Sequence, residues 1–335
     1  MTTEEQIKES LEDVLVPGAM RSLSKLNLVR NISVSDGKAS ISLASTALIP
    51  ESQNWVKAKV DEITKGITRV KNVDIDFVEA TPRELNEVKH VVAIMSGKGG
   101  VGKSLVTSLI GVSLARRGYE VGILDADITG PSIPRMFGID SRPAGSDSGI
   151  IPVPSHLGIG IMSINLLLPN EDDAVIWRGP LIAKTITQFW EDVLWGKLDY
   201  LLVDLPPGTA DAPLTVMQML PLSGVVVVFS PQELAAMVVR KAVQMAQKMN
   251  IPIIGVVENM SYFLLPDSGK RIELFGKSKA EERAKAAGAP LLGQLPIDPD
   301  LARLCDEGNI ERYDSAVLST LADAFLKAMS AIVGE

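Results

Sequence analysis

The stretch Met95-Ser96-Gly97-Lys98-Gly99-Gly100-Val101-Gly102-Lys103-Ser104 decides the fold. It contains the pattern G-x-x-x-x-G-K-[ST], in which glycines let backbone N–H groups turn toward a phosphate chain. An apolar run at 90–94 precedes it, and a segment with helical spacing at 104–117 follows it. This order of strand, glycine loop and helix predicts a nucleotide-binding loop, because the positive end of a helix favours phosphate.

The loop contains two lysines. The pattern places Lys103 at the β- and γ-phosphates of a nucleotide and Ser104 at Mg²⁺. Lys98, directly after the first glycine, is an addition that the general pattern does not require. With it, the loop resembles those of the deviant-Walker ATPases, the group that includes MinD, ParA and the nitrogenase iron protein. The resemblance implies an ATP-dependent homodimer in which Lys98 reaches the partner's nucleotide.

The composition favours a packed globular protein. Of the 335 residues 46% are hydrophobic, and the net charge of −8 disfavours nonspecific binding to nucleic acid or to anionic membranes. The single cysteine, Cys305, excludes an intrachain disulfide and fits a reducing compartment. The first five residues do not have the features of a signal peptide, and the apolar runs have the length of strands. We therefore expect a cytoplasmic protein without a membrane span.

The first 79 residues have the pattern of a small αββαβ domain. Two alternating segments flank Asp36-Gly37, a strong hairpin signal, and each is followed or preceded by helical spacing. The expected elements are a helix at 3–15, strands at 28–34 and 39–43, a helix at 51–67 and a strand at 73–78. This order resembles the PaaD-like domain of iron–sulfur assembly factors. Residues 80–89 are predicted to form a linker, and residues 90–335 the ATPase domain.

From residue 90 onward, apolar runs of strand length alternate with helical segments. This alternation predicts an α/β fold with a mostly parallel, doubly wound sheet. The expected strands are 91–95, 121–124, 200–203, 224–229, 253–257 and 290–295, and the expected helices are 101–117, 181–194, 231–249, 277–287 and 315–333. The last helix is amphipathic without a basic face, which favours a docked core helix over a membrane-binding one.

Three aspartates follow apolar strands of this predicted sheet. Asp125 and Asp127 lie in DADITGPS (125–132), and Asp204 begins DLPPGT (204–209). Ligands bind at the carboxyl ends of parallel strands, so these carboxylates predict an Mg²⁺ site. The resemblance implies that Asp125 and Asp204 hold Mg²⁺ through water, and that Asp127 acts on the attacking water. It also implies that Gly208 senses the γ-phosphate, while Asp127 could alternatively cap a helix that begins near residue 131.

The resemblance also assigns residues to the nucleoside. It places Asn259 at the adenine edge and Pro296 in a segment that closes over the base, although an ordinary turn at Pro296 has nearly equal weight. Trp177-Arg178-Gly179-Pro180 also occurs in the resembled family, but Arg178 receives no role. The expected catalytic residues are Lys98, Lys103 and Asp127. The expected nucleotide-binding residues are Gly97, Gly99, Gly100, Val101, Gly102, Lys103, Ser104, Leu105, Asn259 and Pro296, with Ser104, Asp125 and Asp204 at the metal.

Together, GKGGVGKS, DADITGPS, WRGP, DLPPGT, ENMSYF and GQLPID resemble the Mrp/ApbC-type iron–sulfur cluster carrier ATPases. In that branch a C-x-x-C motif follows the E-N-M-S segment, and a dimer holds a bridging [4Fe–4S] cluster. Here Leu265 and Ser268 occupy the two cysteine positions, and neither supplies a thiolate. Cys305 has neighbours that favour a packing role. The resemblance therefore implies an intact ATPase whose own cluster ligands are missing.

Three functions remain open at this point. The first is a cluster-assembly ATPase that acts with a cysteine-bearing scaffold or client protein. The second is an ATP-switched protein-binding module of the MinD or ParA kind. The third is an unrelated small-molecule or chaperone role. The apolar run 262–265 could serve a client protein or pack in the dimer interface.

Overall fold

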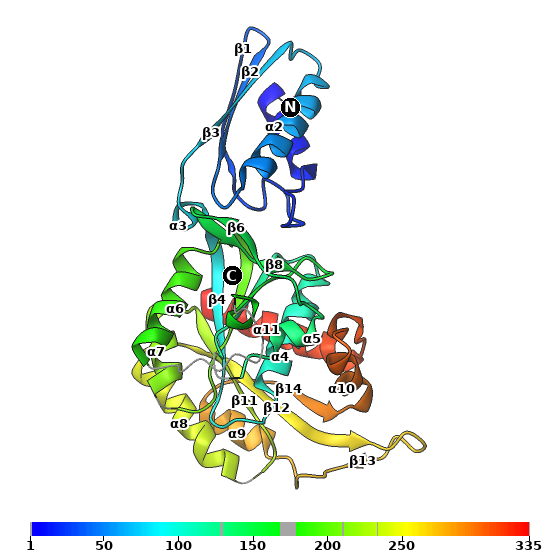
Figure 1. Cartoon of the computed structure of the whole chain (residues 1–335). Coiled ribbons are helices and arrows are strands. Elements are labelled where there is room, and N and C mark those ends of the chain that lie inside the picture. The colour runs from blue at the N-terminus through cyan, green and yellow to red at the C-terminus, as the bar shows by residue number, and fades with distance from the viewer. Residues whose placement is uncertain (1, 128–129, 168–178, 210, 233, 335) are drawn as a thin grey trace. The chain divides into compact units, whose positions relative to one another are not determined.

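The computed structural model describes residues 2–127, 130–167, 179–209, 211–232 and 234–334. They form two compact units (Figure 1). One unit comprises residues 1–89, 141–154 and 188–199, and the other comprises residues 90–140, 155–187 and 200–335. The division into domains at residues 79 and 89 stays a prediction.

The first unit is built on a three-stranded sheet of order β1-β2-β3. β1 and β2 are antiparallel and turn at Asp36 and Gly37, whose φ angles of 49° and 78° are those of a tight hairpin turn. β3 lies parallel to β2, so α2 forms the crossover between them. The elements are α1 (Thr3–Ser10), η1 (Leu11–Asp13), β1 (Val29–Ser35), β2 (Lys38–Ala44), α2 (Pro50–Lys65), β3 (Asn72–Val78), α3 (Pro82–Leu85), β6 (Ala144–Ser146), β7 (Gly149–Ile151) and β8 (Val153–Pro154).

The predicted order of helix, strand, strand, helix and strand is confirmed in this unit, with two differences. The first helix ends at Ser10 rather than residue 15, and a 3-10 turn follows at Leu11–Asp13. Residues 82–85 form a short helix capped by Thr81 and Glu84. Leu85 belongs to the buried core of the unit.

The second unit is an α/β fold around a mostly parallel sheet, as predicted. The strand order runs β12-β11-β4-β10-β5-β9, with β14 parallel and β13 antiparallel to β12. Every residue of β11 is buried, as expected for a strand that is covered on both faces. The strands are β4 (Glu87–Ser96), β5 (Val121–Asp125), β9 (Gly160–Ser163), β10 (Lys197–Asp204), β11 (Gly224–Phe229), β12 (Ile253–Leu264), β13 (Arg271–Ile272) and β14 (Leu291–Ile297).

All five predicted helices of this unit are present, and the described residues contain five further short helical elements, which are α5, η2, α7, α10 and η3. The helices are α4 (Lys103–Ala115), α5 (Ile133–Met136), η2 (Ile164–Leu167), α6 (Gly179–Glu191), α7 (Asp211–Met219), α8 (Leu234–Lys248), α9 (Ala280–Ala287), α10 (Pro299–Asp306), η3 (Ile310–Arg312) and α11 (Ala316–Val333). In the part of the chain that the structure describes, α11 alone is long and apolar enough to cross a bilayer, judged by length and composition. Its buried Leu321, Phe325 and Met329 belong to a helix that packs against α4, β12 and β14, as a core helix does.

Candidate nucleotide site

The strand ends bring the phosphate-binding loop and the carboxylates to one edge of the sheet. β4 ends at Ser96 and α4 begins at Lys103, so residues 97–102 form the loop between them. β5 ends at Asp125 and β10 at Asp204, and these two aspartates pair directly across the parallel ladder. Asp125 also pairs with Ser163 at the end of β9. The sequence patterns therefore meet where a parallel sheet binds its ligands.

The loop conformation requires glycine at Gly102. This residue is the N-cap of α4 and has a φ of 78°. A Cβ added there would lie 2.1 Å from Asn259 Nδ2. The same Nδ2 donates a hydrogen bond to the Val101 carbonyl at 2.9 Å, and Asn259 is only 2% exposed. Asn259 is thus fixed against the loop, on the side where α4 begins.

Lys103 connects the loop to two of the predicted carboxylates. Its side chain is 5% exposed, and its ammonium lies 2.7 Å from Asp204 Oδ2 and 3.5 Å from Asp127 Oδ2. Ser104 Oγ donates to the same Oδ2 of Asp204, and Thr107 Oγ1 donates to Oδ1 at 2.8 Å. Thr107 was not predicted as a site residue. The available signal was its position one turn after Lys103 and Ser104 on the same helix.

Asp125 is fully buried and is held by backbone and hydroxyl donors. It accepts hydrogen bonds from the N–H groups of Asp127 and Ile133 and from Ser163 Oγ, each at 3.3 Å. Burial and the nearby Asp204 raise the pKa of Asp125 to about 8, although Lys103 and the Ile133 N–H act in the opposite direction. Helix α5 begins at Ile133, so Asp125 takes part in the capping that the sequence suggested for Asp127.

The second lysine has a different environment. Lys98 Nζ donates to Gln232 Oε1 at 2.6 Å, and the Lys98 carbonyl accepts from Ser96 Oγ at 3.0 Å. Nearby, the Gly208 N–H donates to the Ser96 carbonyl at 3.0 Å. The donor that the resemblance assigned to the γ-phosphate is therefore engaged with the strand end in this structure.

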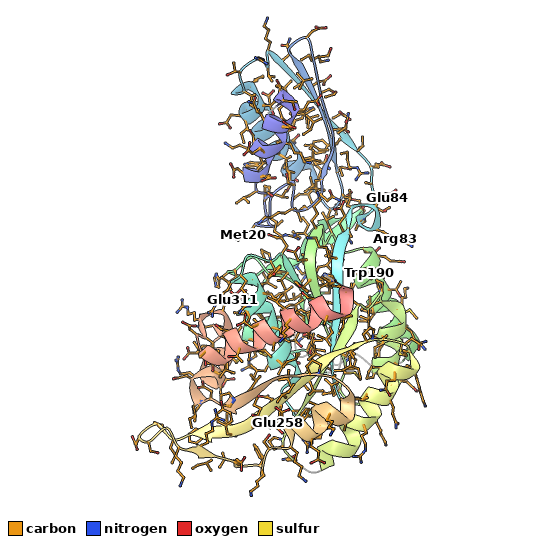
Figure 2. The ribbon with its side chains drawn as sticks, turned by 180° about the vertical axis from the view of Figure 1, so that it is seen from behind. Met20, Arg83, Glu84, Trp190, Glu258 and Glu311 are labelled. Atoms are coloured by element: carbon orange, nitrogen blue, oxygen red, sulfur yellow. The ribbon has the colours of Figure 1, made fainter. Side chains whose placement is uncertain are left out.

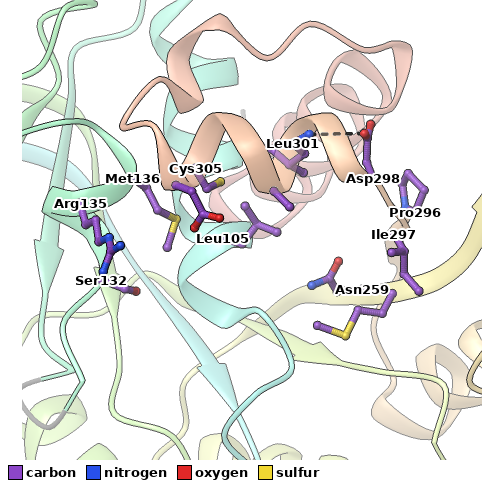
Figure 3. Close-up of a pocket in the computed structure, with 13 residues that line it drawn as sticks. Leu105, Ser132, Arg135, Met136, Asn259, Pro296, Ile297, Asp298, Leu301 and Cys305 are labelled. Carbon is purple, nitrogen blue, oxygen red and sulfur yellow. Dashed lines mark hydrogen bonds between the residues drawn. The ribbon is translucent and has the colours of Figure 1, made fainter.

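A cavity of about 480 Å³ opens beside the first turn of α4 (Figure 3). Its lining brings together Leu105, Asn259 and Pro296, as the expectation for the base required, with Ile297, Leu301 and Cys305. Asp298, at the rim, is held in place because its carboxylate accepts from the Leu301 N–H and the Tyr313 hydroxyl. The cavity combines an apolar wall with one fixed amide, an arrangement suited to a planar base.

Cys305 lines this cavity, and the packing role expected from its neighbours stays a prediction. The thiol is half-buried on α10. Burial, and next the adjacent Asp306, raise the pKa of Cys305 to about 11. The thiol is therefore almost entirely protonated at neutral pH and is a poor metal ligand in this state.

Leu265 and Ser268 lie in the turn between β12 and β13. The Leu265 N–H donates to the Lys270 carbonyl, and the Gly269 N–H donates to the Leu265 carbonyl, which closes the turn. Leu264, Leu274 and Phe275 around this hairpin are exposed by 44%, 56% and 41%. Within the described residues no group of three His, Cys, Asp or Glu side chains could hold a metal ion. Ile128, Thr129 and Arg178 fall outside the described residues.

Comparisons with known proteins agree with this geometry. A family model described as NUBPL iron-transfer P-loop NTPase, of the ParA type, matches residues 87–333. An iron-sulfur cluster carrier protein of Aquifex aeolicus is 38% identical over 97% of this chain and 96% of its own length. One of Clostridium perfringens is 48% identical over 68% of this chain and 82% of its own. A nucleotide-binding protein from Archaeoglobus fulgidus, solved with ADP, is 49% identical with a TM-score of 0.62, over 68% of this chain and 90% of that one.

Proposed function

This chain belongs to the NUBPL-type iron-transfer P-loop NTPases, the family of the iron–sulfur cluster carrier proteins, and on that premise we propose how its own residues act. It is an Mg-ATP-dependent homodimeric ATPase that serves iron–sulfur cluster assembly or transfer together with a cysteine-bearing partner. The single cysteine supports a reducing, cytoplasmic setting.

The observation that carries the ATPase assignment is the buried contact between Lys103 and Asp204 at the start of α4. Lys103 binds the β- and γ-phosphates when they displace Asp204 and Asp127 from its ammonium. The oxygen donors fit Mg²⁺, with the Ser104 hydroxyl as a ligand and Asp125 and Asp204 as acceptors for its waters. Bound Mg²⁺ neutralises phosphate charge. In this proposal Asp127 orients the attacking water and accepts its proton, and its position 3.5 Å from the Lys103 ammonium supports that role.

The base-binding assignment is supported by the cavity beside Leu105. Asn259 donates its amide N–H to Val101, so its Oδ1 remains available to accept from an exocyclic amine. Adenine carries such an amine. Pro296 and Leu105 supply apolar surface to the ring. These contacts support ATP as the nucleotide.

Lys103→Ala tests the ATP site. We expect nucleotide affinity to fall by about 100-fold or more, because the remaining N–H groups leave the phosphate charge without its cation. Isothermal titration with ATP and Mg²⁺ measures this loss. Lys285→Ala, which removes an exposed lysine from α9, is the matched control and should bind as the parent does. Parent-like affinity in Lys103→Ala would remove the site assignment.

The role of the iron–sulfur cluster is a separate part of the proposal, because this chain lacks the family's cysteine ligands for it. Leu265 and Ser268 stand where the resembled carriers have thiolates, so we propose that a partner supplies the cluster ligands. Anaerobic reconstitution of the unmodified protein with iron and sulfide should yield no stable cluster. The double variant Leu265→Cys with Ser268→Cys should gain the absorbance of one. A stable cluster of about four irons per dimer in the unmodified protein would contradict this proposal.

The exposed apolar side chains of the hairpin favour a second candidate. Leu264, Leu274 and Phe275 could bind a protein in an ATP-dependent manner without any iron–sulfur role. Purification of complexes on an Asp127→Ala variant with ATP separates the two functions. A captured partner that binds iron through cysteines supports cluster assembly, and a partner without such cysteines supports the switch module.

A further inference from the structure

The contact between Lys98 and Gln232 links the phosphate-binding loop to the segment after β11. Lys98 Nζ and Gln232 Oε1 are 2.6 Å apart. The Gln232 side chain comes from a solvent-exposed residue, whereas Lys98 is half-buried. A free lysine side chain samples many rotamers, so a contact that holds the ammonium reduces the conformational entropy lost when Lys98 binds phosphate.

The backbone beneath Gln232 is held by a buried arginine. Arg283 on α9 is 4% exposed, and its guanidinium donates to the carbonyls of Ser230, Pro231 and Gln232 at 2.6, 3.0 and 2.9 Å. It also lies over the Phe229 ring, 4.9 Å from the centroid. Three consecutive carbonyls bound by one planar group leave this segment little freedom. Gln232 is therefore an acceptor on a fixed platform.

The platform is itself tied to the strand that bears Asn259. Glu258 on β12 (Figure 2) accepts from Ser278 Oγ at 2.6 Å, and the Lys279 N–H points to the same carboxylate at 3.4 Å, just before α9 begins. The helix that places Gln232 is thus fixed at one end by the residue next to Asn259. α9 and the residues just before it are therefore linked both to the Gln232 segment, through Arg283, and to the Asn259 strand, through Glu258.

The chemistry of the acceptor matters as much as its position. Lys103 is already paired with Asp204 and Asp127 at this sheet edge. A carboxylate in place of Gln232 would neutralise Lys98 in the same way. A neutral amide oxygen accepts a hydrogen bond from one of the three ammonium N–H groups. The positive charge and the other two donors stay available for phosphate oxygens.

We infer that Gln232 is a positioning residue for Lys98, which orients its ammonium through a neutral acceptor for the phosphates of the partner's nucleotide. This inference rests on the proposed function, in which Lys98 acts across an ATP-dependent dimer. Arg283 fixes the platform, and Gln232 itself contacts neither nucleotide nor water in the reaction.

Gln232→Met tests the inference because methionine has a similar length and no oxygen acceptor. We expect kcat for ATP to fall about 3- to 10-fold with KM within twofold, the size expected for the net loss of one ordinary hydrogen bond. Gln247→Met, at an exposed position on α8, is the matched control and should keep the parent kcat. An unchanged or raised kcat in Gln232→Met would overturn the inference.

A double-mutant cycle shows whether the effect passes through Lys98. The dimer dissociation constant is measured by analytical ultracentrifugation with a non-hydrolysable ATP analogue. Gln232→Met should weaken the dimer in the parent and have no effect in the Lys98→Ala background. Equal weakening in both backgrounds would mean that Gln232 acts independently of Lys98.

The outcomes separate this inference from the proposed function. Parent-rate hydrolysis by Lys98→Ala would defeat the role of Lys98 in trans, whatever Gln232→Met does. Loss of hydrolysis in Lys98→Ala combined with a parent kcat in Gln232→Met would defeat only the positioning role.

Discussion

At the scale of single residues, the phosphate-binding loop contains two glycines with nearly the same positive φ angle and different surroundings. Gly100 and Gly102 have φ angles of 77° and 78°. A Cβ on Gly100 would meet nothing within 4 Å, whereas a Cβ on Gly102 would collide with Asn259 Nδ2. The conformation alone therefore explains a glycine at both positions, and only Gly102 is also required by the close approach of a neighbour.

The pair provides a controlled test of that difference. Gly100→Ala should lose about 1–2 kcal/mol of unfolding free energy from the left-handed backbone alone. Gly102→Ala should lose about 1–3 kcal/mol more, because the new methyl group displaces Asn259 from the Val101 carbonyl. Urea unfolding without nucleotide compares the two variants. Equal stabilities would show that Asn259 moves aside without cost.

Cys305 lines the cavity that Asn259 and Leu105 also line, so its reactivity can be used to detect a ligand there. Because its pKa is raised to about 11, its alkylation by iodoacetamide should be slow at pH 7 and should rise about tenfold per pH unit up to pH 9. Bound ATP should slow the reaction further, because the thiol lines the cavity. As the chain has one cysteine, the label needs no background correction. Alkylation at the same rate with and without ATP would place the nucleotide elsewhere.

The site residues differ in how far the sequence could predict them. Lys103, Ser104, Asp125 and Asp204 follow from a local motif and from the rule that strand ends gather at one edge. Gln232 could not be found in that way. Its relation to Lys98 depends on Arg283, a residue 51 positions away that binds the Gln232 carbonyl, and no local pattern encodes such a contact.

At the scale of elements, the long apolar strands and amphipathic helices were predicted and the short ones were missed. β11 matches its predicted bounds because a strand that is covered on both faces has a continuous apolar run, and all six of its residues are buried. β9 has four residues, too few for a periodic signal, and it forms through its pairing with β5. The helix at 211–219 was missed because it starts within a glycine- and proline-rich stretch. Tertiary pairing, rather than local propensity, decides such segments.

The junction of β12, β14 and α9 depends on one carboxylate. Glu258 is fully buried and accepts from Ser261 Oγ and Ser278 Oγ at 2.6 Å each and from Gln294 Nε2 at 3.0 Å. Glu258→Ala leaves these buried donors short of an acceptor, so we expect a loss of about 2–3 kcal/mol in unfolding free energy. Glu281→Ala, at an exposed position on α9, is the control in the same urea titration. Similar stabilities of the two variants would assign the junction to its apolar contacts.

At the scale of the whole molecule, each chain has the residues of one ATP site and a second lysine, Lys98, that the proposed dimer uses at the partner's ATP site. Lys103 contacts the carboxylates of its own chain, whereas Lys98 is bound to Gln232. If Lys98 completes the partner's site, the two lysines serve different active sites although they lie five positions apart. Hydrolysis would then require two chains, each providing one of the two functions.

Mixing two inactive variants tests this arrangement. Lys98→Ala keeps its own ATP site and lacks the lysine for the partner, and Lys103→Ala has the reverse defect. A mixed dimer contains one complete site, formed by the ATP of the first chain and Lys98 of the second. An equimolar mixture should therefore regain about a quarter of the parent rate, because half of the dimers are mixed and each has one of two sites active, provided that the chains pair at random. The double variant Lys98→Ala with Lys103→Ala is the control, since it offers no lysine and should rescue nothing when mixed with Lys98→Ala. If the first mixture hydrolyses ATP no faster than its components, Lys98 acts within its own chain.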